Sequence, residues 1–140
     1  MSLIHQATAV AIGGRAVLIE GPPGIGKTSL ALALIDRGAA LIGDDGVTLE
    51  HRDARLLASP PPNTAGLIEV RNLGLLPWPT VSDVPVALIL RLDPDAPRFI
   101  EVAVQTELAG IAVPLIRLWP DGAVLALKAE LALERFGSNI

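Results

Sequence analysis

Cysteine is absent from the 140-residue sequence. Its absence excludes disulfides, thiolate metal sites and a cysteine nucleophile. Tyrosine is absent too, and two Trp and two Phe are the only aromatic residues, so the core must consist mainly of Leu, Ile, Val and Ala. No apolar run approaches the roughly 20 residues that span a bilayer. The sequence therefore predicts no membrane partner.

Basic runs of the kind that bind polyanions are also missing. The net charge is −4, and a weakly acidic protein neutralises nucleic-acid phosphates poorly. We therefore expect no nucleic-acid partner. The N-terminal segment has no basic region typical of a signal peptide. Together with the lack of cysteine, this favours a cytoplasmic location.

The length and composition are those of one ordinary globular domain. Apolar residues make up 51% of the 140 residues, and no linker or internal repeat divides the chain. We therefore expect a single domain over residues 1–140.

Short apolar runs rich in β-branched residues predict the strands. They lie at 7–12, 16–21, 39–43, 47–51, 55–59, 66–70, 84–92 and 112–118. Helical spacing predicts helices over 27–38 and 123–137, the first with a glycine stop at Gly38. Many strands with one helix near each end of the chain indicate an α/β or α+β class.

The segment GPPGIGKTSL (21–30) carries the strongest motif of the sequence. It matches the pattern G-x-x-x-x-G-K-[ST], after a predicted strand and at the start of a predicted helix. Backbone N–H groups of such a loop converge on phosphate oxygens, and the helix N-terminus adds partial positive charge. The predicted nucleotide-binding residues are Gly21, Pro22, Pro23, Gly24, Ile25, Gly26, Lys27, Thr28 and Ser29.

Two roles within this segment follow from phosphoryl-transfer chemistry. Lys27 is expected to reach the β- and γ-phosphates, and the Thr28 hydroxyl to bind Mg²⁺. Such a site also needs a carboxylate near the terminal phosphate and a group that accepts the proton of the attacking hydroxyl.

Asp44 and Asp45 follow the strand that succeeds the first helix. If that strand runs parallel to strand 16–21, both aspartates lie at the edge that carries the glycine loop. Asp93, which ends the apolar run 84–92, is the competing candidate for the metal-binding acid.

Glu69 lies within the apolar run 66–70, where a buried carboxylate is costly unless it is paired or bound to metal. Arg71 alternates onto the same face and is its possible partner. His5 is a weaker candidate, because a lone His in an N-terminal strand is more often solvated than catalytic.

Taken together, residues 14–47 (GRAVLIEGPPGIGKTSLALALIDRGAALIGDDGV) and 67–76 (LIEVRNLGLL) resemble the catalytic domain of HPr kinase/phosphorylase. The aspartate pair comes seventeen positions after the loop lysine, and the segment with Glu69, Arg71 and Gly74 follows in order. The resemblance covers roughly residues 3–118. It is greatest to the short single-domain form, which lacks the N-terminal regulatory domain.

The resemblance implies a P-loop kinase domain related to phosphoenolpyruvate carboxykinases, with a central mixed β-sheet, a P-loop helix and a C-terminal helix. It also implies an ATP- and Mg²⁺-dependent kinase acting on a serine of HPr, a carrier protein of the sugar phosphotransferase system. Many members also run the reverse, phosphorolytic reaction. Full-length members are hexamers, so a homo-oligomer is expected.

The resemblance also implies roles for individual residues. Asp44 corresponds to the acid/base aspartate, Asp45 to its neighbour in the catalytic pair, and Glu69 to the acid that helps to hold Mg²⁺. In a kinase of this type we expect Thr28, Asp45 and Glu69 to hold the metal, directly or through water. His5 corresponds to the histidine that opens the family's catalytic domain. The nearest candidate for the family's catalytic arginine is Arg98. The sequence departs from the long form of the family in lacking its PVRPGRN-like segment, and it reads VPLIRLWPDG (113–122) instead.

Two other classes of function stay open from the residues alone. A small-molecule or nucleotide kinase would usually carry an arginine-rich lid, and the arginines here are scattered. A non-catalytic or switch-like nucleotide-binding module would use Asp93 rather than Asp44 as its metal acid.

Overall fold

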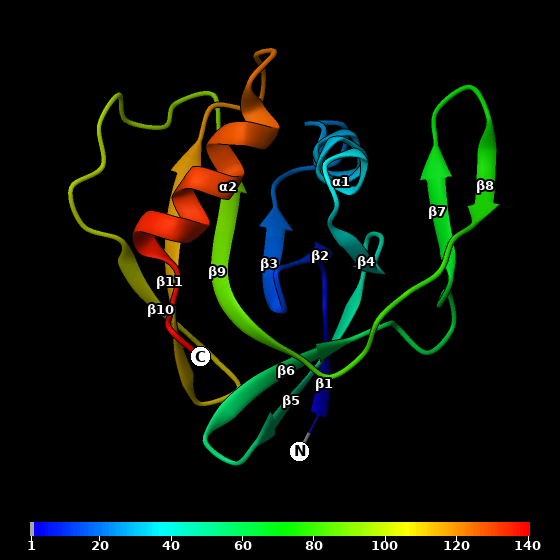
Figure 1. The fold of residues 1–140 in the computed structure, drawn as a ribbon, viewed down its shortest axis with the longest axis horizontal. Helices are drawn as coiled ribbons and strands as arrows, with labels where there is room; N and C mark the ends of the chain where they lie inside the picture. The colour runs from blue at the N-terminus through cyan, green and yellow to red at the C-terminus, as the bar shows by residue number, and fades with distance from the viewer. Residues whose placement is uncertain (1) are drawn as a thin grey trace.

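The strands and helices follow the apolar patterns of the sequence closely (Figure 1). The structure is a computed structural model and describes residues 2–140. Its elements are β1 (Ser2–His5), β2 (Thr8–Ile12), β3 (Arg15–Glu20), α1 (Lys27–Asp36), β4 (Ala40–Gly43), β5 (Val47–Arg52), β6 (Arg55–Ser59), β7 (Leu67–Val70), β8 (Gly74–Pro77), β9 (Val84–Leu92), β10 (Val104–Leu108), β11 (Ile111–Leu118) and α2 (Leu125–Phe136).

The central sheet is built around β9. The strands β3 and β11 flank it and run parallel to it. On one side β2 pairs antiparallel with β3, and β4 pairs antiparallel with β2. On the other side β10 forms an antiparallel hairpin with β11. The fold is therefore a mixed α/β fold, as the sequence predicts.

A second layer of strands lies behind the central sheet. Its order is β1-β5-β6, and β6 pairs antiparallel with the beginning of β9 through Leu57 with Pro85 and Ala58 with Val84. The long strand β9 therefore belongs to both layers, and Figure 1 shows it curving from one into the other. A separate hairpin of β7 and β8 stands beside α1.

Two hydrophobic clusters hold these layers together. One packs α1 and α2 against the sheet and includes Leu34, Leu88 and Ala129. The other fills the space between the sheets and includes Leu18 and Ile89. The neighbours Leu88 and Ile89 belong to different clusters because successive side chains of a strand point to opposite faces. This explains why 84–92 reads as a continuous apolar run, since both faces are buried.

The strand pairing holds one feature that the sequence did not indicate. The strand β4 runs parallel in direction to β3, as expected, but β2 lies between them. The glycine loop after β3 and the aspartate pair after β4 still open at the same end of the sheet. The strands β1, β8 and β10 were also not among the predicted apolar runs. In residues 2–140, no helix combines the length and the apolar character that a bilayer crossing requires.

The turn after β4 predicts a steric test of the fold. A Cβ on Gly43 would lie 2.2 Å from the Gly46 carbonyl oxygen and 2.9 Å from Pro61 Cδ. We expect Gly43→Ala to lower the free energy of unfolding by about 1–3 kcal/mol, because it overpacks a closed turn. Urea denaturation measures this loss.

Gly46→Ala is the matched control. A Cβ there would meet Pro61 only at ordinary contact distances of 3.6–3.8 Å. We expect this variant to stay within about 0.5 kcal/mol of the unsubstituted protein. Equal stability of the two variants would contradict the close approach at Gly43.

Candidate active site at the glycine loop

The glycine loop joins β3 to α1 at the upper end of the sheet in Figure 1. Gly26 has φ 113°, a left-handed conformation that a residue with a side chain adopts only at a cost. The helix begins at Lys27, and its first backbone bond runs from Leu30 N to Gly26 O (3.0 Å). The N–H groups of the first turn therefore have no acceptor within the helix and face the loop's concave side, where an anion would bind.

The side chain of Lys27 folds back over its own loop. Its Nζ donates to the carbonyl oxygen of Gly21 (2.6 Å) and lies 3.4 Å from that of Pro22. The ammonium group is therefore held at the loop itself rather than extended into solvent.

Asp44 is fixed by hydrogen bonds from three elements. Its Oδ1 accepts from the Thr28 hydroxyl of α1 (2.8 Å) and from the Thr8 hydroxyl of β2 (3.3 Å). Its Oδ2 accepts from the backbone N–H of Glu69 in β7 (2.8 Å). The carboxylate thus bridges the start of α1, strand β2 and the β7–β8 hairpin.

Asp45 lies beside it in a different environment. Its backbone N–H donates to Thr8 Oγ1 (3.2 Å), and its side chain is exposed. Its φ of 59° places it in the left-handed region, which Asp tolerates better than most residues. The neighbouring aspartates therefore present their carboxylates to different surroundings.

A cleft of about 500 Å³ opens over these groups. The glycine loop and the start of α1 form one wall, and the aspartate pair with Glu69, Val70 and Arg71 forms the other. Glu69 is exposed, so the desolvation cost considered from the sequence does not arise. The described residues hold no ion pair between Glu69 and Arg71. The Arg71 guanidinium lies instead over the loop, 3.9 Å from where a Cβ of Gly24 would be.

Most of the predicted site residues line this one cleft. They are Pro23, Gly24, Gly26, Lys27, Thr28, Ser29, Asp44, Asp45 and Glu69. Gly21, Pro22 and Ile25 belong to the same loop but lie behind its lining surface. These residues shape the loop, for example through the hydrogen bond from Ile25 N to Pro22 O (3.3 Å).

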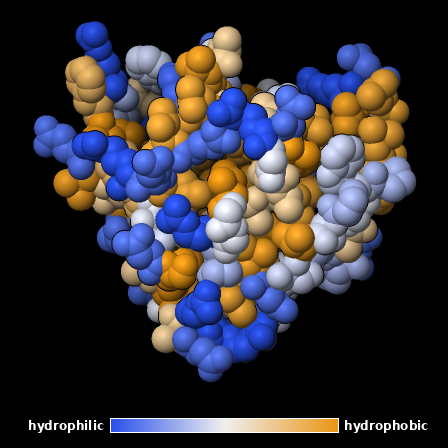
Figure 2. Space-filling view, viewed as in Figure 1, coloured by the Kyte–Doolittle hydropathy of each residue, from blue (hydrophilic) through white to orange (hydrophobic). Residues whose placement is uncertain are grey.

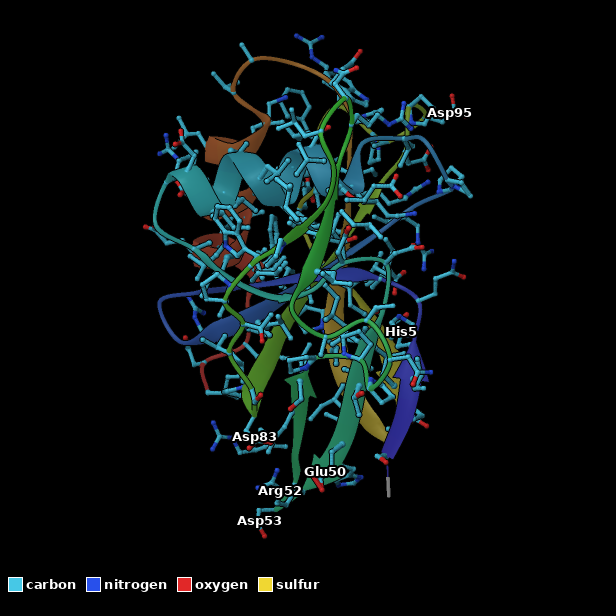
Figure 3. The ribbon with its side chains drawn as sticks, turned by 90° about the vertical axis from the view of Figure 1, so that its right-hand side faces the viewer. His5, Glu50, Arg52, Asp53, Asp83 and Asp95 are labelled. Atoms are coloured by element: carbon cyan, nitrogen blue, oxygen red, sulfur yellow. The ribbon has the colours of Figure 1, made fainter. Side chains whose placement is uncertain are left out.

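His5 lies outside the cleft lining and pairs with Glu20, the residue before the glycine loop. The distance from His5 Nε2 to Glu20 Oε2 is 2.7 Å, and Arg91 donates to the other carboxylate oxygen at 2.8 Å. Burial alone would raise the pKa of Glu20, but the hydrogen bonds from His5 and Arg91 outweigh it and hold the pKa below its ordinary value of 4.5. Figure 3 shows His5 on β1, midway between the two ends of the molecule.

Arg98 and Asp93 lie elsewhere. Arg98 lines a separate cleft beside α2, and its guanidinium lies 5.4 Å from the Phe99 ring centroid. Asp93 accepts from Asp95 N (2.8 Å) and from Arg117 (3.2 Å), and these bonds hold its pKa below the ordinary value. In its structural role Asp93 closes the turn that leaves β9. It is not part of the cleft lining, whereas Asp44 is.

The cleft offers oxygen ligands of the kind that Mg²⁺ prefers. The Thr28 hydroxyl, the Asp44 and Asp45 carboxylates and Glu69 all line it. Within residues 2–140, no group of three or more His, Cys, Asp or Glu side chains is arranged to hold a metal by itself. This donor set fits an ion that keeps waters and takes its remaining ligands from nucleotide phosphates, which is the usual Mg²⁺ arrangement.

Sequence reasoning missed three residues of this region. Thr8 is fully buried and holds both aspartates in place. Arg71 was considered only as a partner of Glu69, and Glu20 was not considered at all. A buried Thr in an apolar strand and a Glu before a glycine loop are visible in the sequence, but only the strand pairing shows what they contact.

Strand, glycine loop, helix and an acid-lined cleft at the same sheet edge define an α/β protein with a candidate site at the start of α1. Comparison with protein families finds that the family described as "HPr Serine kinase C-terminal domain" matches residues 2–81. That is more than half of the chain, and the chain belongs to this family.

Individual proteins that are similar in sequence to this chain bear the same family name. The HPr kinase/phosphorylase of Clostridium tetani is 42% identical over 72 residues, which cover 51% of this chain and 24% of that protein. The one from Clostridium botulinum (strain Eklund 17B / Type B) is 45% identical over 67 residues, covering 48% and 22%. The chain matches about a quarter of the length of these curated relatives.

Solved structures give a broader match. The structure of the Hpr(Ser) kinase/phosphatase from Coxiella burnetii superposes with a TM-score of 0.85 at 29% sequence identity. The match covers 94% of this chain and 88% of that one. The likeness therefore includes the strands and the C-terminal helix beyond residue 81, which the family match does not reach.

The His5–Glu20–Arg91 group predicts a pH-dependent contribution to stability. A carboxyl whose folded-state pKa is lowered stabilises the fold above its ordinary pKa, and this stabilisation is lost as the pH falls through the folded-state value. We expect Glu20→Gln to lower the free energy of unfolding by about 1–2 kcal/mol at pH 7, with the difference from the unsubstituted protein shrinking as the pH falls below 4.5.

Urea denaturation at a series of pH values measures this difference. Glu107→Gln is the control, since Glu107 is exposed and has no ion pair within the described part of the chain. A Glu20→Gln effect that is unchanged from pH 7 to pH 3 would show that the carboxylate charge is not involved.

Proposed function

We propose that this protein is an ATP- and Mg²⁺-dependent protein-serine kinase that phosphorylates an HPr-like phosphocarrier protein. The observation that carries the proposal is the 2.8 Å bond between the Thr28 hydroxyl and Asp44. It joins the phosphate-binding motif to the acid motif in one cleft. Family membership gives the substrate class, because the relatives are named for their action on HPr.

In this proposal the glycine loop binds the phosphates of ATP. The first-turn N–H groups and Lys27 hold the β- and γ-phosphates, and Arg71 adds a further cation above Gly24. Thr28, Asp45 and Glu69 hold Mg²⁺, directly or through water. When bound, the metal neutralises charge on the phosphates as the terminal group is transferred.

Asp44 is proposed to accept the proton of the attacking serine hydroxyl. Its two oxygens are held in place by Thr28, Thr8 and the Glu69 backbone, so the carboxylate needs little reorganisation before it acts. The bond between the γ-phosphorus of ATP and the β,γ-bridging oxygen breaks, and ADP leaves with that oxygen. The γ-phosphoryl group joins the serine oxygen, whose proton passes to Asp44.

Several further features are part of the same proposal. The reverse reaction, in which inorganic phosphate removes the phosphoryl group, is supported by the names of the relatives. A cytoplasmic location agrees with the lack of cysteine. A homo-oligomer is proposed from the family resemblance. His5 is proposed to act through Glu20 at the start of the loop rather than in the cleft itself. Arg98, the candidate for the family's catalytic arginine, lines the separate cleft beside α2.

The roles of the two aspartates predict different defects. We expect Asp44→Asn to bind Mg²⁺-ATP with nearly unchanged affinity and to lose about 10²–10⁴-fold in the rate of phosphoryl transfer, as is typical when a general base is removed. Asp45→Asn should instead reduce the gain in ATP affinity that Mg²⁺ provides. Titration with a fluorescent ATP analogue and single-turnover transfer measure the two effects.

Asp93→Asn serves as the control, because Asp93 binds Arg117 outside the cleft. It should leave nucleotide affinity and transfer unchanged. Full transfer activity in Asp44→Asn would show that Asp44 is not the proton acceptor. If Asp45→Asn lost transfer and Asp44→Asn lost the effect of Mg²⁺ on ATP binding, the roles of the two aspartates would be exchanged.

The substrate is tested by incubation with γ-labelled ATP and purified HPr. We expect label on HPr as phosphoserine, and none on HPr in which that serine is replaced by alanine. Absence of label on HPr, together with tight ATP binding and transfer to a small-molecule acceptor, would favour the small-molecule kinase instead. ATP binding without any transfer would favour a nucleotide-binding module.

A further inference from the structure

A second cleft lies beside α2 and shares no lining residue with the site at the glycine loop. Its volume is about 400 Å³, and it runs between α2, the end of β11 and the segment 97–100. We call it the α2 groove. On α2 the lining residues Lys128, Leu131, Ala132 and Arg135 have the spacing i, i+3, i+4 and i+7, so one face of the helix forms a wall.

The charge of the α2 groove is of one sign. Four of the chain's eleven Lys and Arg residues line it, and none of its fifteen Asp and Glu residues does. Arg117 is paired with Asp93. The other three, Arg98, Lys128 and Arg135, have no ion pair among residues 2–140. In a chain with a net charge of −4, this is a local concentration of unpaired positive charge.

The same groove gathers the aromatic residues. Three of the four in the chain, Phe99, Trp119 and Phe136, line it. Each has a cation 5.3–5.5 Å from its ring centroid, which is within cation–π range. Figure 2 views the molecule from the side of α2 and shows orange apolar surface interleaved with blue hydrophilic side chains there.

Three large apolar side chains of the groove are exposed. Phe99 is 78% exposed, Leu131 53% and Trp119 43%. A smaller hollow of about 200 Å³ is also lined by Phe99 and reaches Val102 and Val104, with Glu101 as its one acidic residue, so the apolar surface is elongated. Apolar surface that is continuous in this way marks a place where another molecule binds.

We propose that the α2 groove binds an amphipathic helical segment of a partner protein, with apolar side chains along one stripe and acidic side chains beside it. Charge complementarity selects this occupant, since an apolar stripe would cover Phe99 and Leu131 while its flanking carboxylates meet Lys128 and Arg135. A small ligand fits the shape less well, because small-molecule sites bury about 70–90% of their ligand and these walls are open.

The test uses synthetic helical peptides labelled with fluorescein. One carries Leu at i, i+3, i+4 and i+7 with Glu on both flanks, a second has Lys in place of each Glu, and a third keeps the Glu residues but has Ser in place of each Leu. We expect the first peptide alone to bind with a Kd in the micromolar range, and its affinity to fall as the salt concentration rises. Fluorescence anisotropy gives the affinities.

Variants of the protein locate the binding. The double variant Lys128→Glu/Arg135→Glu should weaken binding of the first peptide about tenfold and improve binding of its Lys counterpart. Phe99→Ser should weaken binding of the first peptide through the apolar contact, and it removes a side chain that contributes little to the core. Arg55→Glu is the matched control, since Arg55 is an exposed cation outside the groove, and it should leave binding unchanged.

Four outcomes would overturn the proposal. The first is failure of the Glu peptide to bind, and the second is equal binding of the Glu and Lys peptides. The third is self-association of the protein, measured by sedimentation, that Phe99→Ser abolishes. The fourth is binding to phosphatidylglycerol vesicles that the double variant abolishes. The third would assign the groove to a second copy of this chain and the fourth to a lipid surface. Thermal unfolding of each variant confirms that it is folded before the comparison is made.

Discussion

The carboxylate of Asp44 is the point on which the site depends. It accepts hydrogen bonds from Thr28 at the start of α1, from Thr8 on β2 and from the backbone of β7. The start of α1 and strand β7 contribute lining residues of the cleft, and the buried Thr8 of β2 anchors the carboxylate from the core side. A single partly buried group therefore connects the three elements. Hydrogen bonds to an ionised carboxylate are stronger than neutral ones, and three of them hold the side chain in one orientation.

The architecture explains how such a small chain positions two distant motifs. The strand β9 pairs with β3 and β11 in one layer and with β6 in the other. Its side chains therefore enter both hydrophobic clusters. With the sheets fixed to one another in this way, the ends of β3 and β4 open at the same edge although β2 separates them. The cleft is a consequence of strand direction rather than of direct pairing.

The cleft at the glycine loop and the exposed apolar surface beside α2 lie apart on the molecule. The cleft at the glycine loop combines Lys27 and Arg71 with three carboxylates, a mixture suited to a metal and phosphates. The α2 groove has aromatic rings and cations without carboxylates. The charged cluster of Glu50, Arg52, Asp53 and Asp83 lies at a third place, at the lower end of the molecule in Figure 3. The two clefts share no lining residue.

The sequence alone determined the elements whose signals are local. The apolar runs predicted most strands and both helices, and the spacing of Gly21, Gly26, Lys27 and Thr28 identified the loop. Which carboxylate faces that loop depends on contacts between residues far apart in the chain. The sequence favoured Asp44 over Asp93, but only the tertiary structure shows that Asp44 lines the cleft and that Asp93 does not. It also placed Arg98 in another groove and joined Glu20 to His5 and Arg91. Hydrophobic periodicity reports which face of a strand is buried, but the order of strands in a sheet depends on packing between residues far apart in the chain.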